Sequence, residues 1–196
     1  FVATELQHLT QPAGGPFVGQ STSSGSPVPV DTSDINRFVA ILRSYGLEPG
    51  SSGAVTNENP LTNLFARLDV RLPGRSGRLV LEHNYAGARQ DRFDRSSPGV
   101  FPLSSYAWHQ WSRAYVTVAR LYASLPNGAA NELIARHYTG PVTNEPSVQQ
   151  PLILAAAQLV SGAGTSFLQS GTNETAQRNS VSQHSLEFRD NLTLLL

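Results

Sequence analysis

Residues 64–72 read LFARLDVRL and residues 78–85 read RLVLEHNY, and the turn sequence PGRSG fills positions 73–77 between them. In the first segment every even-numbered residue is apolar. The odd-numbered positions after Phe65 are Arg67, Asp69 and Arg71. Alternation with a period of two, on both sides of a short glycine- and proline-rich turn, is typical of an antiparallel β-hairpin. We therefore predict that the two segments pair, with Leu68 and Leu81 on the same face.

The two faces of this hairpin differ in chemistry. Charged side chains, including Arg67 and Glu82, lie on one face, while leucine and valine side chains lie on the other. In a membrane barrel the apolar face contacts lipid and the charges line a hydrated interior. In a soluble β-sandwich the same apolar side chains fill a core, and alternation alone leaves both possibilities open. The candidates for contact with lipid or with a partner are Leu64, Leu68, Val70, Leu72, Leu79 and Leu81.

Other parts of the chain show weaker patterns. Residues 1–33 are rich in Gly, Pro, Ser and Thr and are expected to form a loop or extended segment. Apolar residues at helical spacing, after N-capping side chains and before a glycine, predict a short helix over 34–45. Aromatic and β-branched residues at 111–123 and 131–138 predict a second hairpin, and alternation at 185–195 predicts a final strand.

Long polar connections are expected at 86–110 and 139–184, between strands that are otherwise joined by short turns. Compact soluble domains rarely contain several loops of this length, whereas membrane barrels combine short turns on one side with long loops on the other. Residues 64–72 also have about the 9–11 positions that a tilted membrane strand needs. We expect a mainly β fold in which residues 34–196 form antiparallel hairpins of an incomplete barrel-type sheet, with one short helix.

Composition argues against an enzyme. The sequence has no cysteine, and all 14 basic residues are arginine, so thiolate nucleophiles, iron–sulfur ligation and lysine chemistry are excluded within it. Fourteen acidic residues balance these arginines, which gives nucleic-acid binding little electrostatic support. We expect no catalytic residue, cofactor or metal site, because no metal-binding or hydrolase motif is present. The five histidines are scattered over positions 8, 83, 109, 137 and 184.

Four aromatic residues gather in the middle of the chain. Trp and Tyr side chains concentrate where a membrane meets water, because the ring is apolar and its edge is polar. The same residues could equally form an aromatic cluster in a soluble core. These candidate interface aromatics are Tyr106, Trp108, Trp111 and Tyr115.

Six motifs follow one another in a recognisable order. They are RFVAIL at 37–42 with Tyr45-Gly46, PLTNLFARLD at 60–69, RLVLEHNY at 78–85, FPLSS at 101–105, NEL at 131–133 and LEFRDNLTL at 186–194. In this order the chain resembles the barrel region of TonB-dependent receptors, in particular the Oar-like outer-membrane receptors that carry a carboxypeptidase-regulatory-like domain.

The resemblance implies a non-catalytic segment of a receptor that transports a nutrient across the bacterial outer membrane. It departs from the family pattern because no plug domain and no TonB-contacting motif is recognisable in 1–33, so contact with TonB is expected only through parts outside this sequence. The alternative is a β-rich accessory subunit, docked on the periplasmic side of a larger membrane protein complex. Either way, the expected partners are membrane lipid or a membrane complex in the cell envelope, and not nucleic acid.

Overall fold

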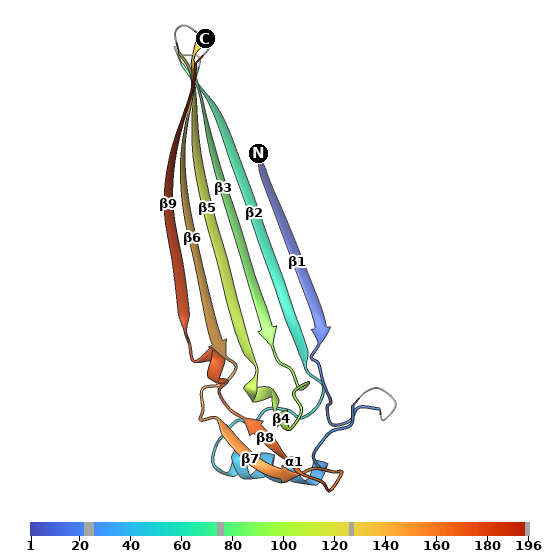
Figure 1. The fold of residues 1–196 in the computed structure, drawn as a ribbon. Helices are drawn as coiled ribbons and strands as arrows, with labels where there is room; N and C mark the ends of the chain where they lie inside the picture. The colour runs from blue at the N-terminus through green and yellow to red at the C-terminus, as the bar shows by residue number, and fades with distance from the viewer. Residues whose placement is uncertain (22–25, 74–76, 126–127, 195–196) are drawn as a thin grey trace.

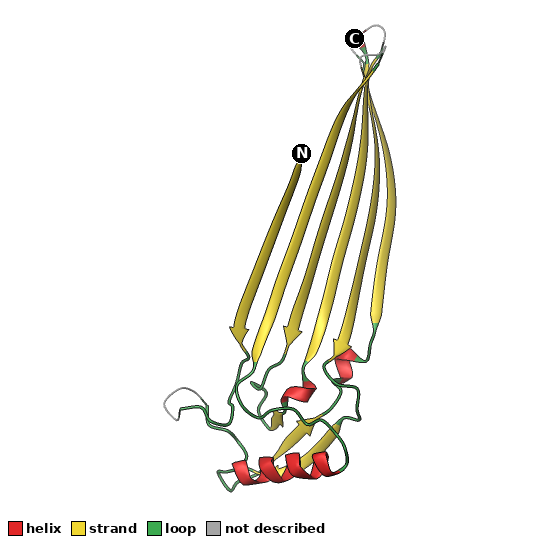
Figure 2. Cartoon of the chain, turned by 180° about the vertical axis from the view of Figure 1, so that it is seen from behind, coloured by secondary structure: helices red, strands yellow, loops and turns green. Residues whose placement is uncertain are grey.

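The computed structural model describes residues 1–21, 26–73, 77–125 and 128–194. These residues form a six-stranded sheet and, at one end of it, a smaller folded region that we call the cap (Figures 1 and 2). The fold is mainly β with long connections and one α-helix, as predicted. The strands of the large sheet, in spatial order, are β1 (Val2–Pro12), β2 (Thr56–Leu72), β3 (Gly77–Arg92), β5 (Trp108–Ser124), β6 (Ala130–Pro146) and β9 (Ser180–Thr193).

The predicted first hairpin is confirmed. Strands β2 and β3 pair antiparallel, Leu68 lies opposite Leu81, and Arg67 lies opposite Glu82. Both strands extend well beyond the predicted segments, to 17 and 16 residues. Of the predicted turn at 73–77, residues 74–76 lie outside the described part of the chain.

The second hairpin and the last strand are also confirmed. Strand β5 pairs antiparallel with β6, and β6 pairs antiparallel with β9. The connections expected at 86–110 and 139–184 are shorter than predicted, because β3, β5, β6 and β9 reach into them. They also contain a second, three-stranded sheet with β8 (Thr165–Ser170) between β4 (Val100–Pro102) and β7 (Ile153–Gln158). Strands of three or six residues are too short to give a clear alternation.

The N-terminal segment contains a strand that composition did not indicate. Residues 1–33 were expected to form a loop or extended segment, but Val2–Pro12 pairs along its whole length with β2 as the edge strand β1. All of its residues are exposed. Thr4 and His8 share a face with Val2 and Leu6, and this mixture of polar and apolar residues explains why the strand gives no clear alternation.

Helix α1 (Thr32–Ser44) confirms the helix predicted at 34–45, with a start two residues earlier. The Asp31 carboxylate accepts a hydrogen bond of 2.7 Å from the Ser33 amide and so caps the N-terminus. Gly46 adopts a positive φ of 73° after the last turn, and the Leu47 amide donates back to the Leu42 carbonyl. This is the ordinary glycine stop of a helix.

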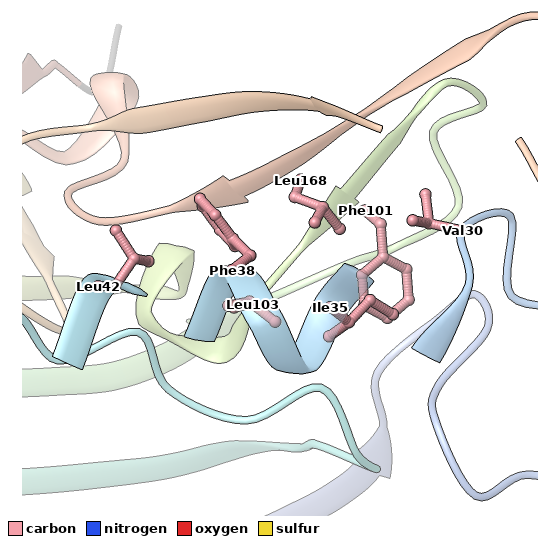
Figure 3. Close-up of a cluster of buried hydrophobic side chains, with 7 residues drawn as sticks. All are labelled: Val30, Ile35, Phe38, Leu42, Phe101, Leu103 and Leu168. Carbon is pink, nitrogen blue, oxygen red and sulfur yellow. The ribbon is translucent and has the colours of Figure 1, made fainter. Parts of the chain in front are cut away.

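The buried hydrophobic core lies in the cap. Three long connections build it together: residues 13–55 between β1 and β2, 93–107 between β3 and β5, and 147–179 between β6 and β9. Figure 3 shows the apolar side of α1 against side chains from β4, β8 and the segments beside them. The buried cluster consists of Val30, Ile35, Phe38, Leu42, Phe101, Leu103 and Leu168.

Candidate functional site

The six candidate side chains lie on one face of the large sheet, as the alternation predicted. Successive residues of a strand point to opposite faces, so the register places Leu68, Leu81, Ala119 and Ala135 side by side across four strands. We call this side the apolar face. It continues beyond the candidates with Leu121 on β5, Leu133 on β6, and Leu186, Phe188 and Leu192 on β9.

The apolar face is open. Leu68 is 56% exposed, and Leu64, Val70 and Leu81 are 37–38% exposed, while Leu72 and Leu79 are half-buried by their neighbours in the sheet. In both views the large sheet is a single layer, and the cap covers its end rather than a face. Among the described residues there is therefore no second layer against the leucines. A charged residue also lies on this face: Asp190 has an exposed carboxylate and lies opposite Leu133.

The opposite side, the polar face, carries a network of ion pairs across three strands. Arg67 donates to both carboxylate oxygens of Asp69, at 2.7 and 3.1 Å, and to Glu82 at 3.1 Å. Glu82 also accepts from Arg120 of β5. The Arg78 guanidinium lies 4.9 Å from the centre of the Tyr122 ring. These contacts pair the charges of the network with one another, and Val80, Val118 and Ile134 lie on the same face.

The four candidate aromatics do not form one cluster. Trp111 and Tyr115 lie on the apolar face, where Tyr115 packs against Tyr85 with ring centres 5.1 Å apart. Trp108 lies on the polar face, and Tyr106 belongs to the short 3-10 helix η1 (Ser104–Tyr106) in the cap. The prediction of a single aromatic group is therefore wrong. Of the four, only Trp111 and Tyr115 lie on the apolar face, on the side of the cap.

Tyr106 and Trp108 instead help to line a groove of about 430 Å³ between the polar face and the cap. Burial, with the nearby Glu174 carboxylate, raises the pKa of the Tyr106 hydroxyl, which therefore stays protonated. Aromatic surface next to amides and charges suits a small polar ligand. Sequence reasoning missed this groove because its lining comes from five distant segments. It includes Gln11, Asn57, Arg92, Asp94, Tyr106, Trp108 and Asn173.

A buried arginine joins the cap connections to one another. Arg95 is 4% exposed and donates to three backbone carbonyls, those of Pro102 at 2.9 Å, Gly53 at 2.7 Å and Ser51 at 2.9 Å. Burial lowers the pKa of its guanidinium to about 10, so the group remains charged at neutral pH. Its role is structural, because its donors bind two of the three connections together. No local motif marks it in the sequence.

The described residues include no group of three or more histidine, aspartate or glutamate side chains placed to hold a metal ion. Within the same residues, no helix has the length and apolar character needed to cross a membrane.

No protein-family model, curated protein or solved structure matches this chain. The likeness to TonB-dependent receptors therefore depends on the six sequence motifs and stays a prediction.

Proposed function

We propose that this chain forms part of the wall of an outer-membrane β-barrel, in a receptor of the TonB-dependent type. In this arrangement the apolar face contacts lipid, and the polar face lines the hydrated interior. The observation that carries the proposal is the exposed apolar face on a single-layered sheet. A soluble sheet would leave these side chains in water, at about 25 cal/mol for each Å² of apolar surface.

The dimensions of the apolar face support the proposal. On β2 the apolar residues run from Leu64 to Leu72, which is eight residue steps, or about 27 Å along a strand at about 3.4 Å per residue. A strand tilted by about 40° would then cross about 21 Å, close to the apolar band of about 25 Å in known membrane barrels. The remaining length of the strand extends beyond this band toward the cap.

The border of the apolar face is oblique to the strands, as tilt requires. On β1 the apolar residue nearest the cap is Leu6, which lies opposite Thr62 of β2. On β9 it is Leu186, which lies at the level of Ala66 of β2 through the intervening pairs. From β1 to β9 the border thus moves by four residues (66 − 62), which is about 14 Å along the strands. The same step crosses five strand spacings, or about 24 Å across the sheet. Between these two outer strands the shift corresponds to an angle of about 30°.

The connections also follow the barrel pattern. The turns after β2 and β5 are short, and the three connections at the opposite end are long and form the cap. In outer-membrane barrels the short turns face the periplasm and the long loops face the outside. The cap is then extracellular, and its groove beside Trp108 opens toward the interior of the barrel.

Membrane extraction tests the proposal. We expect the protein to stay with the outer-membrane fraction after carbonate washing and to become soluble only with detergent. Recovery as a folded monomer without detergent would contradict it. Recovery in a stable complex, with Leu68 and Leu81 cross-linking to a second protein and not to lipid, would replace it with the accessory-subunit alternative.

A further inference from the structure

A mixed belt of polar side chains borders the apolar face on the side of the cap. We call residues that lie opposite one another across the strands a row. On β3, β5 and β6, the row next to Leu81 on the side of the cap aligns His83, Thr117 and His137. The next row aligns Tyr85, Tyr115, Thr139 and His184. Amphipathic rings and hydroxyl groups of this kind belong at the boundary between hydrocarbon and headgroups.

The histidine rings in this belt are held in place by hydroxyl groups. The Thr139 hydroxyl lies 3.2 Å from Nδ1 of His184 and 3.5 Å from Nε2 of His137, and the Ser182 hydroxyl lies 2.9 Å from Nε2 of His184. His83 is held similarly by Thr117 at 2.9 Å. Imidazole and hydroxyl groups therefore form a row of hydrogen-bonding groups, which is exposed at His137 and His184.

Arg113 lies one row further toward the cap and supplies a permanent positive charge. Its side chain is exposed, and among the described residues no carboxylate forms an ion pair with it. It lines a cavity of about 310 Å³ between β5 and β6, together with Trp111 and Pro141. The ladder between the two strands is interrupted there, between the Ser112–Val142 and Tyr115–Thr139 pairs, because proline has no N–H to donate.

Still nearer the cap, the carboxylates of Asp91 and Glu58 are paired with basic groups. Arg89 forms ion pairs with Asp91 at 2.9 Å and with Glu58 at 3.7 Å, and His109 also contacts Asp91 at 2.8 Å. Glu145 lines the same cavity as Arg113 on the side of the cap, whereas His137 lies on the side of the leucines. At this border Arg113 and the histidines of the belt therefore lie nearer the leucines, and the carboxylates of Glu58, Asp91 and Glu145 lie nearer the cap.

We propose that Arg113, His137 and His184 bind the phosphate groups of lipid headgroups at the outer border of the apolar face. This inference rests on the proposed function. An occupant that fits must place an anion against Arg113 and the histidines and apolar chains against the leucines next to them. A phosphate-bearing lipid has both parts, and arginine binds phosphate with paired, charge-assisted hydrogen bonds.

Spin-labelled lipids test this inference on the full protein, reconstituted in phosphatidylcholine vesicles. The spectrum of a lipid next to the protein shows a motionally restricted fraction, which can be compared for labelled phosphatidylcholine and labelled phosphatidic acid. We expect phosphatidic acid to be preferred by more than about fivefold, because one basic side chain near a charged lipid surface contributes about that factor. In the Arg113→Gln variant the preference for phosphatidic acid should fall about fivefold for the same reason. Arg113→Lys should keep most of it.

A matched control removes a positive charge from the other face. Arg71→Gln changes an exposed arginine of β2 on the polar face and should leave the lipid preference unchanged. The combined His137→Gln and His184→Gln variant should lower the preference further in the Arg113→Gln background. Equal restriction of both lipids by the unchanged protein would overturn the inference and leave the barrel intact. Absence of any restricted lipid would overturn both proposals.

Discussion

The cap and the large sheet treat apolar side chains in opposite ways. In the cap, seven apolar side chains from three connections are packed together and almost fully buried. In the large sheet, apolar side chains of similar size point away from the molecule, and Leu68, Leu186 and Phe188 are more than half exposed. The cap thus has a buried apolar core of its own. The sheet leaves its apolar side chains exposed, and the proposed position in a membrane would cover them with lipid.

The largest expected effect comes from emptying the core of the cap. Phe101 is fully buried, so Phe101→Ala should destabilise the cap by about 3–5 kcal/mol. If cap and sheet depend on different environments, the sheet should still assemble in the membrane. Hydrogen exchange of residues 93–107 and 147–170 in the assembled protein would report the loss of protection.

Phe167 offers a matched control within the same small sheet. It is 44% exposed on β8, so Phe167→Ala should change protection far less than Phe101→Ala. Equal effects of the two substitutions would show that the buried cluster does not hold the cap together.

A charge on the apolar face should affect the sheet and spare the cap. Leu68→Arg would place a guanidinium in hydrocarbon, at about 2–4 kcal/mol near the middle of the bilayer. We expect less protein to assemble in the outer membrane, measured as the folded, protease-resistant fraction. Asn84→Arg adds the same group on the polar face, at an exposed position of β3, and should assemble normally. Normal assembly of both variants would argue against lipid at Leu68.

The smallest expected effect concerns the end of the helix in the cap. Gly46 has a φ of 73° and open space around the position of a Cβ atom, so Gly46→Ala should cost about 1–2 kcal/mol through backbone strain alone. Gly46→Asn should cost less, because asparagine adopts this conformation more readily. Thermal unfolding of the cap, followed by hydrogen exchange, would rank the three proteins; an alanine variant as stable as the glycine protein would contradict the assignment.

The sequence predicts the large sheet well and the cap poorly, for a physical reason. Alternation is local, so 64–72 and 78–85 could be paired from their own residues, and the two faces followed directly. The cap depends on contacts between residues far apart in the chain. Phe101, Leu103 and Leu168 lie in short strands or turns with no period of their own, and their burial follows only when the three connections meet.

The candidate site was likewise predicted only where a local sequence pattern determines it. The six leucine and valine candidates share one face because a strand fixes side-chain direction every second residue. The aromatic candidates were grouped by closeness in sequence, and the structure separates Trp108 from Trp111 because three positions along a strand reverse the face. Arg113 carries no local signal at all. Its importance depends on Pro141, which lies in the neighbouring strand.

Spin-label accessibility along β2 tests the central claim most directly. The chain has no cysteine, so single cysteines at Arg67, Leu68, Asp69 and Val70 can each be labelled as unique sites within it. In outer membranes, labels at 68 and 70 should be accessible to oxygen and shielded from a water-soluble nickel chelate, and labels at 67 and 69 should show the reverse. Nickel accessibility at all four positions, or no alternation between them, would contradict a sheet with one face in lipid and the other in water.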